Sequence, residues 1–149
     1  MGRLKLPFAG PVYLDSNILI YRVERHEPYC EVLNPLWLAV EEGTVAAITS
    51  ELSLVEILTK PIRENNSALA GTYRELILNA KGIHPAPVSR EVLTKAAEIR
   101  AHFGLKTPDA IHAATALLHP AALFLTNDSV FKRVPLLPVV LADEWINPE

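Results

Sequence analysis

The sequence predicts a three-layer α/β/α fold, in which a central, mainly parallel sheet of four to five strands is covered by helices on both faces. Five short runs are apolar throughout instead of alternating, which is typical of strands buried on both sides. Longer segments with helical periodicity lie between these runs. Because the alternation of strand and helix requires crossover connections, it favours parallel pairing.

The expected elements follow one another in a regular order along the chain. Strands are expected at residues 11–15, 45–50, 83–88, 122–126 and 138–142. Helices are expected at residues 16–25, 29–42, 50–60, 67–80, 90–103 and 108–118, and most joins carry a proline or a glycine. We predict a single domain over residues 1–149, in which residues 1–11 form an N-terminal extension ahead of the first strand.

The composition is that of a globular protein, with 50% hydrophobic and 21% charged residues. The single cysteine, Cys30, excludes an internal disulfide and a cysteine-based zinc site. No apolar run approaches the ~20 residues of a membrane span, and residues 1–11 do not resemble a signal peptide, so we expect a soluble, cytoplasmic protein. The net charge of −3 neither indicates nor excludes nucleic acid as a partner.

Acidic and small polar side chains follow two of the expected strands. Residues 15–17 are Asp-Ser-Asn and residues 126–128 are Thr-Asn-Asp, each directly after an apolar run. Asp15 and Asp128 could each simply cap the helix that follows, because such side chains accept bonds from first-turn amides. In an open parallel sheet, however, active sites form outside the carboxyl ends of the strands. The repeated arrangement is hard to attribute to capping alone.

Two further acids lie on helices that begin near the same edge of the predicted sheet. Glu56 falls on the polar side of the 50–60 helix, where it could face solvent or form a capping box with Ser53. Asp109 lies in the first turn of the 108–118 helix, a position that the helix dipole alone favours by ~0.3–1 kcal/mol. That helix is apolar on almost every face, so we expect its first acid to point into a cleft.

Four carboxylates that converge need either protons or a cation. At separations of ~5 Å and an effective dielectric near 20, each pair repels by roughly 3 kcal/mol, so the six pairs reach on the order of 20 kcal/mol. This exceeds the ~5–15 kcal/mol by which a typical domain is stable. Oxygen-only ligands favour Mg²⁺ or Mn²⁺ over zinc. A metal-activated water at such a site suits hydrolysis of phosphodiester bonds.

Four segments of the chain resemble those of a known family. The segments YLDSNILIY, SELSLVEILTKP, AAEIRAHFGLKTPDAIHAATAL and LFLTNDSVF, in this order and spacing, are similar to the PIN domain and, within it, to the VapC-type toxins of toxin–antitoxin pairs. The resemblance covers nearly the whole chain and implies a homodimeric, Mg²⁺-dependent endoribonuclease in which Mn²⁺ can substitute. It also implies that a cognate VapB-like antitoxin silences the enzyme. The chain departs from the family in the residues that precede its first strand.

The resemblance also implies roles for individual residues. It makes one set the catalytic and metal-binding acids: Asp15, Glu56, Asp109 and Asp128. It gives supporting roles, in holding carboxylates or waters, to Ser16, Asn17 and Thr126. Arg100 matches the basic residue before the glycine in the third segment and is a candidate contact to the RNA. His112, inside the apolar helix, is interpreted as a core histidine with satisfied hydrogen bonds.

Two alternatives remain open from the sequence. The chain could be a non-catalytic PIN-like module that binds RNA or a protein. It could also be a different Mg²⁺-dependent, phosphate-handling α/β enzyme, although a phosphatase of the haloacid-dehalogenase type would need a second aspartate where Asn17 stands.

Overall fold

The computed structural model describes residue 6 and residues 10–146. Most of the predicted extension, residues 1–5 and 7–9, lies outside the described residues, as do residues 147–149. No helix formed by the described residues is long and apolar enough to cross a lipid bilayer.

The centre of the structure is a five-stranded sheet in the order β3-β2-β1-β4-β5, and every neighbouring pair is parallel. The strands are β1 (Val12–Leu14), β2 (Ala47–Ser50), β3 (Ile83–Ala86), β4 (Leu123–Thr126) and β5 (Val139–Leu141). All five coincide with runs predicted from the sequence. The sheet is entirely parallel, and the predicted three-layer fold is confirmed.

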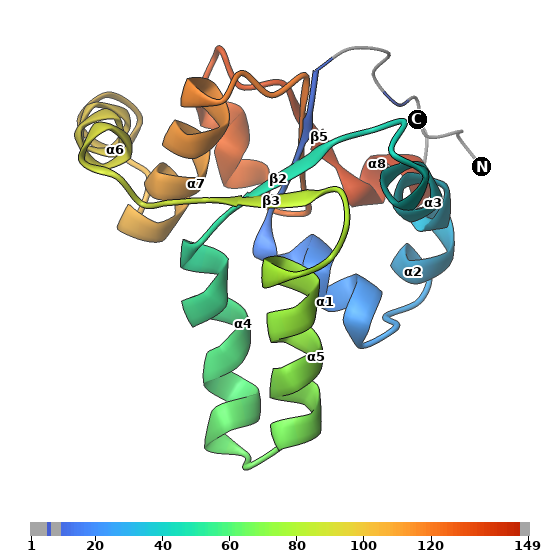
Figure 1. Ribbon diagram of the computed structural model, residues 1–149. Helices are drawn as coiled ribbons and strands as arrows, with labels where there is room; N and C mark the ends of the chain where they lie inside the picture. Colours follow the sequence, from blue (N-terminus) through green and yellow to red (C-terminus); the bar gives the residue numbers. More distant parts are fainter. Residues whose placement is uncertain (1–5, 7–9, 147–149) are drawn as a thin grey trace.

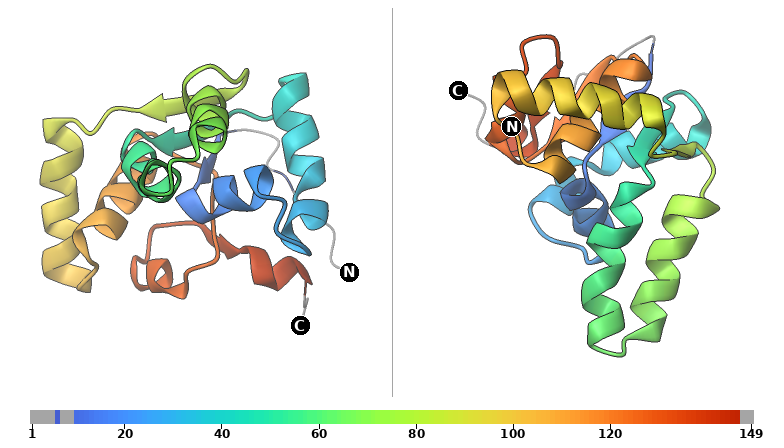
Figure 2. Two further views of the ribbon diagram at one scale, coloured as in Figure 1. Left: turned by 90° about the horizontal axis from the view of Figure 1, so that it is seen from below. Right: turned by 90° about the vertical axis from the view of Figure 1, so that its left-hand side faces the viewer.

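Helices cover both faces of the sheet, as Figures 1 and 2 show. They are α1 (Ser16–Val23), α2 (Tyr29–Val32), α3 (Asn34–Glu42), α4 (Leu52–Arg63), α5 (Ser67–Leu78), α6 (Arg90–Phe103), α7 (Thr107–Leu118) and α8 (Ala142–Ile146), with a 3₁₀ turn, η1 (Ser129–Arg133), after β4. Side chains alternate across β1: Val12 and Leu14 join the core under α1, α3 and α5, whereas Tyr13 joins the core under α6 and α7. β1 is therefore buried on both faces, as its unbroken apolar sequence predicted.

The helices of the structure differ from the predicted ones in four details. The 29–42 segment forms two helices that meet at Leu33, because Pro35 has no N–H and fits only the first turn of a new helix. The 50–60 helix continues through Pro61, whose ring is buried, as far as Arg63. The cap of α7 is Lys106, and residues 142–146 form a short helix that was not predicted.

Candidate active site

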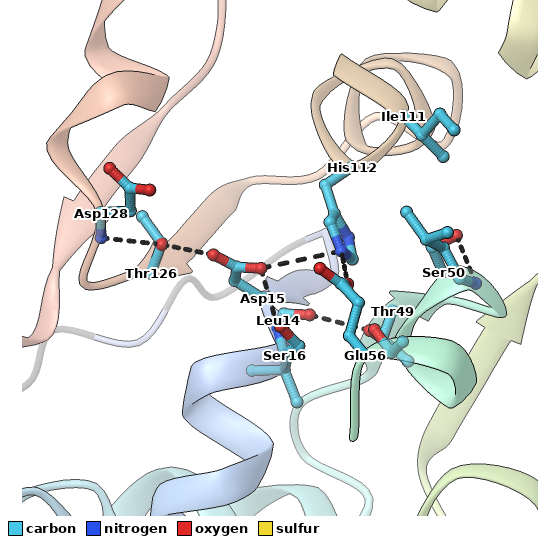
Figure 3. Close-up of polar contacts among 12 residues, drawn as sticks. Leu14, Asp15, Ser16, Thr49, Ser50, Glu56, Ile111, His112, Thr126 and Asp128 are labelled. Carbon is cyan, nitrogen blue, oxygen red and sulfur yellow. Dashed lines mark hydrogen bonds and ion pairs between the residues drawn. The ribbon is translucent and has the colours of Figure 1, made fainter. Parts of the chain in front are cut away.

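The four predicted acids lie on connections that leave one edge of the sheet. Asp15 directly follows β1 and precedes α1, and Asp128 follows β4 and precedes η1. Glu56 lies on α4, the helix that follows β2, and Asp109 lies in the first turn of α7. Figure 3 shows Asp15, Glu56 and Asp128 on the side where β1 and β4 end.

Asp15 is the most buried of these acids, with 6% of its surface exposed. Its Oδ1 accepts a hydrogen bond from the backbone N–H of Ser16 at 2.8 Å, and its Oδ2 accepts one from the Thr126 hydroxyl at 2.6 Å. Burial raises the pKa of the Asp15 carboxyl, and His112 and the two hydrogen bonds offset this only in part. Asp15 caps α1, as the capping interpretation predicts. It also contacts Thr126 at the end of β4.

Asp128 is exposed and caps η1, because its Oδ1 accepts a hydrogen bond from the Val130 N–H at 3.0 Å. Its own N–H donates to the Thr126 hydroxyl oxygen at 3.1 Å. The Thr126 hydroxyl therefore accepts a hydrogen bond from the Asp128 N–H and donates one to Asp15 Oδ2. The predicted supporting position of Thr126 corresponds to a direct contact with both acids.

The polar residues after β1 contribute in different ways. Ser16 holds Asp15 through its backbone N–H. Asn17 Oδ1 is buried and has no hydrogen-bond partner among the described residues. On the neighbouring strand, Thr49 is fully buried and donates to the Leu14 carbonyl at 2.9 Å, which ties β2 to the end of β1. Thr49 was not among the predicted site residues, because a threonine inside a strand carries no signal of such a contact.

Glu56 does not simply face solvent, nor does it form a capping box with Ser53. Its Oε1 lies 2.5 Å from His112 Nε2, and the Ser53 hydroxyl instead pairs with Thr49 at 2.9 Å. His112 Nε2 also lies 3.8 Å from Asp15 Oδ1, so one imidazole nitrogen stands between two of the four acids. His112 is a fully buried histidine with satisfied hydrogen bonds, as expected, but its partner is a site residue, and the sequence analysis missed this.

Burial lowers the pKa of His112, but the hydrogen bond to Glu56 and the charges of Asp15, Glu56 and Asp109 outweigh that effect and raise it. The pKa of Asp109 is raised by burial and, next in size, by the charges of Asp128 and Asp15. Acids from separate connections are therefore near enough to influence each other's ionisation. The convergence of all four acids on one metal site stays a prediction.

The four carboxylates nevertheless do not form a ready-made coordination shell. Within residues 6 and 10–146, no three His, Cys, Asp or Glu side chains lie close enough together to ligate one ion. The carboxylates of Asp15 and Glu56 are directed toward protein donors instead, the first toward Ser16 and Thr126 and the second toward His112. The four acids therefore differ from the expected arrangement around one ion, because two of them already accept hydrogen bonds from protein donors.

Arg100 lies in the last turn of α6, and its Nε donates to the Leu105 carbonyl at 3.2 Å. That contact supports the end of α6, where Gly104 adopts a left-handed conformation with φ of 69°. Among the described residues, Arg100 makes no ion pair with the four acids.

A family model described as "PIN domain" matches residues 12–137, which include the four acids and His112. The chain belongs to the PIN domain family. The match confirms the family predicted from the sequence and covers β1 through η1 with all four candidate acids.

Solved structures share the fold of this PIN domain at low sequence identity. VapBC2 from Rickettsia felis, bound to a DNA fragment from their promoter, is 19% identical with a TM-score of 0.69, over 87% of this chain and 97% of that chain. A toxin–antitoxin complex from Klebsiella pneumoniae is 23% identical with a TM-score of 0.64, over 88% and 97%. Mycobacterium tuberculosis VapC20, described as a Sarcin-Ricin loop cleaving toxin, is 15% identical with a TM-score of 0.68, over 86% and 98%. No curated protein matches the sequence.

The side chains of this PIN domain fit a hard divalent cation in their chemistry. All four acids offer oxygen, and each Asp15 oxygen that accepts one hydrogen bond keeps a second lone pair. Mg²⁺ retains several waters and commonly takes only one or two carboxylates directly, so three preformed side-chain ligands are not required. The oxygen donors of the four acids are therefore compatible with a divalent cation.

Proposed function

We propose that this PIN domain is a Mg²⁺-dependent endoribonuclease of the VapC toxin type, and that Mn²⁺ can replace Mg²⁺. The observation that carries the proposal is the set of contacts that connects three acids from separate connections: Thr126 bonds to Asp15 and to the Asp128 N–H, and His112 Nε2 lies beside both Asp15 and Glu56. Such a concentration of negative charge at the strand ends of a parallel sheet is typical of a cation-assisted phosphate site.

In this proposal Asp15, Glu56, Asp109 and Asp128 would together hold the ion. When bound, Mg²⁺ neutralises charge on the scissile phosphate and activates a water for hydrolysis. Thr126 fixes the Asp15 carboxylate, and Ser16 fixes the other oxygen of the same group. Glu56, whose side chain is 28% exposed, would accept a proton from the attacking water in this proposal.

The proposal includes partners. The Klebsiella pneumoniae neighbour is a toxin–antitoxin complex, and the Rickettsia felis neighbour is a VapBC complex, which supports a VapB-like antitoxin as the protein that silences this enzyme. VapC20 is described as a toxin that cleaves the Sarcin-Ricin loop, which supports RNA as the substrate class. A homodimer acting in the cytoplasm completes the proposal.

The test is cleavage of a labelled RNA with Mg²⁺, with Mn²⁺ and with excess EDTA, by the wild type and by Asp109→Asn. We expect cleavage that requires the metal and that Asp109→Asn abolishes while the protein stays folded. The matched control is Glu98→Gln, which removes the same charge from an exposed ion pair with Lys95 on α6 and should cleave normally. Cleavage by Asp109→Asn at the wild-type rate, or cleavage unaffected by EDTA, would refute the proposal.

The second candidate is a non-catalytic PIN-like module that binds RNA or a protein. One observation favours it: no three potential ligands in the described part of the chain lie within reach of one ion. Titration with Mn²⁺ separates the candidates, because a module without a metal site should show neither heat of binding nor a change in melting temperature.

A further inference from the structure

Three side chains form a continuous hydrogen-bonded series from the core to the acidic edge. The Tyr13 hydroxyl on β1 lies 2.6 Å from His112 Nδ1 on α7, and His112 Nε2 lies 2.5 Å from Glu56 Oε1 on α4. Tyr13 and His112 are fully buried, whereas the Glu56 side chain is 28% exposed. The series therefore begins in the interior and ends on one of the four proposed catalytic acids.

The direction of these hydrogen bonds follows from the chemistry of the groups. An ionised carboxylate only accepts, so Nε2 of His112 donates to Glu56. Burial raises the pKa of the Tyr13 phenol well above its usual range, so the phenol stays protonated. Its hydroxyl can therefore donate a hydrogen bond to Nδ1 of a neutral His112 ring. A protonated ring also carries hydrogen on Nε2. The donor that faces Glu56 is therefore the same in either protonation state of His112.

Packing holds the buried members of the series, Tyr13 and His112, in place. The Tyr13 ring stacks on Phe124 with centroids 4.9 Å apart and planes 5° apart, and it meets His112 edge to face at 5.8 Å. Neither Tyr13 nor His112 has room to rotate, because both are completely enclosed. Glu56, by contrast, has a long side chain, and the preceding residue on α4, Val55, is exposed. Packing alone therefore does not fix the orientation of Glu56, which depends on its hydrogen bond to His112.

A histidine with a purely structural role does not need such partners. An apolar residue of similar volume would fill the space beneath α7 without the cost of burying two ring nitrogens. Here the second nitrogen is directed to the acidic edge, 2.5 Å from Glu56 and 3.8 Å from Asp15 Oδ1. In Figure 3, Asp15 and Glu56 both lie beside the imidazole of His112. Only Oε1 of Glu56 is used in this contact, which leaves Oε2 for a ligand.

We propose that His112, oriented by Tyr13, is a positioning residue that fixes the Glu56 carboxylate beside Asp15 for cation binding and hydrolysis. This inference rests on the proposed function and adds to it two residues that act through Glu56 and touch neither the cation nor the RNA. Hydrogen bonds to the carboxylates and histidines around a metal orient them, and their loss typically lowers metal affinity or activity by ~10–100-fold.

The test compares the Mn²⁺ dissociation constants of the full-length wild type and three variants by isothermal titration calorimetry, with circular dichroism as the check on folding. His112→Leu removes both nitrogens and should weaken binding ~10–100-fold. His112→Gln offers an amide N–H near the position of Nε2 and should recover most of that loss. Tyr13→Phe removes one hydroxyl, keeps the ring stack, and should weaken binding several-fold.

The matched control is Tyr73→Phe. Tyr73 is another buried tyrosine whose hydroxyl donates to a glutamate, Glu24, but it belongs to α5 and contacts none of the four acids. This variant should lose stability and keep the wild-type Mn²⁺ affinity. If His112→Leu fails to fold, Tyr13→Phe and His112→Gln still decide the matter.

The outcomes separate the two proposals. Wild-type protein that binds no Mn²⁺ overturns the proposed function and this inference with it. Wild-type binding combined with unchanged affinity in folded His112→Leu or Tyr13→Phe overturns the positioning role alone. Equal losses in His112→Leu and His112→Gln also overturn it, because a packing defect, unlike a lost donor, is not repaired by glutamine.

Discussion

The Thr126 hydroxyl donates to Asp15 Oδ2 at 2.6 Å and joins the ends of β4 and β1 across 111 residues of sequence. The same hydroxyl oxygen accepts from the Asp128 N–H, so one side chain sets the relative positions of two acids. The parallel register of β1 and β4 places Thr126 beside Asp15, and its hydroxyl bonds connect two of the four acids.

Thr126→Val tests this link, because valine keeps the shape and removes the hydroxyl. We expect RNA cleavage to fall at least ~10-fold and the free energy of unfolding to fall by ~1–3 kcal/mol, since Asp15 and the Asp128 N–H each lose a partner. Cleavage assays and urea denaturation provide the two measurements. Thr59→Val is the control, because the exposed Thr59 hydroxyl bonds only to the Val55 carbonyl on α4. Wild-type cleavage by Thr126→Val would contradict the role of the link.

Asp109→Asn should make the metal-free protein more stable at neutral pH. Burial and the charges of Asp128 and Asp15 raise the pKa of Asp109 in the folded state. The folded state therefore holds this proton more tightly than the unfolded chain, and the free energy of unfolding falls as pH rises from the unfolded pKa of ~3.9 through the folded pKa. The asparagine variant avoids that loss.

The measurement is urea denaturation in EDTA at pH 7 and again well below the unfolded pKa of ~3.9. The stabilising difference between Asp109→Asn and the wild type should be present at pH 7 and disappear well below that pKa, where Asp109 is protonated in both states. Glu98→Gln, with the same change of charge on an exposed part of α6, should show no such pattern. A loss of stability at pH 7 in Asp109→Asn would mean that the charge stabilises the fold, contrary to the proposed repulsion.

Metal should reverse the destabilisation that the acids cause. A ligand present at about 100 times its dissociation constant stabilises the folded state by ~2.7 kcal/mol. We expect Mn²⁺ at that level to raise the wild-type melting temperature in differential scanning calorimetry, and EDTA to restore the original value. The melting temperature of Asp15→Asn should rise much less with Mn²⁺, because this variant lacks a proposed metal ligand. In the wild type, Ser16 and Thr126 hold that carboxylate in place. An equal response in the two proteins would exclude Asp15 from the metal site.

The sheet was predictable from the sequence because buried parallel strands leave a local signature. Val12, Tyr13 and Leu14 are all fully buried, and a run of three apolar residues is the direct consequence. The same logic located Asp15, which follows such a run directly, and Asp128, which follows one after Thr126 and Asn127. Both positions depend on neighbours in the sequence, and local patterns encode them well.

The pairing of Glu56 with His112 was not predictable in the same way. It depends on how α4 and α7 lie against each other, and 56 residues separate the two side chains. One signal was present: His112 lies one turn after Asp109 on a helix that is otherwise almost free of polar side chains. The break at Leu33 was missed for a simpler reason, because the helical period continues across it and only Pro35 indicates a new start.

Arg100 has a predicted role in RNA binding and a structural contact at the end of α6, and the two can be tested separately. Its Nε supports the Leu105 carbonyl, so a loss of stability on mutation would say nothing about RNA. The decisive quantity is the salt dependence of RNA binding, because each phosphate contact on a single strand contributes ~0.7 to the slope of log affinity against log salt. We expect Arg100→Gln, in the inactive Asp109→Asn background, to reduce that slope by about this amount. Arg74→Gln, an exposed charge on α5, should leave it unchanged. Equal slopes for Arg100→Gln and its parent, measured by fluorescence anisotropy from low to high KCl, would restrict Arg100 to its contact at the end of α6.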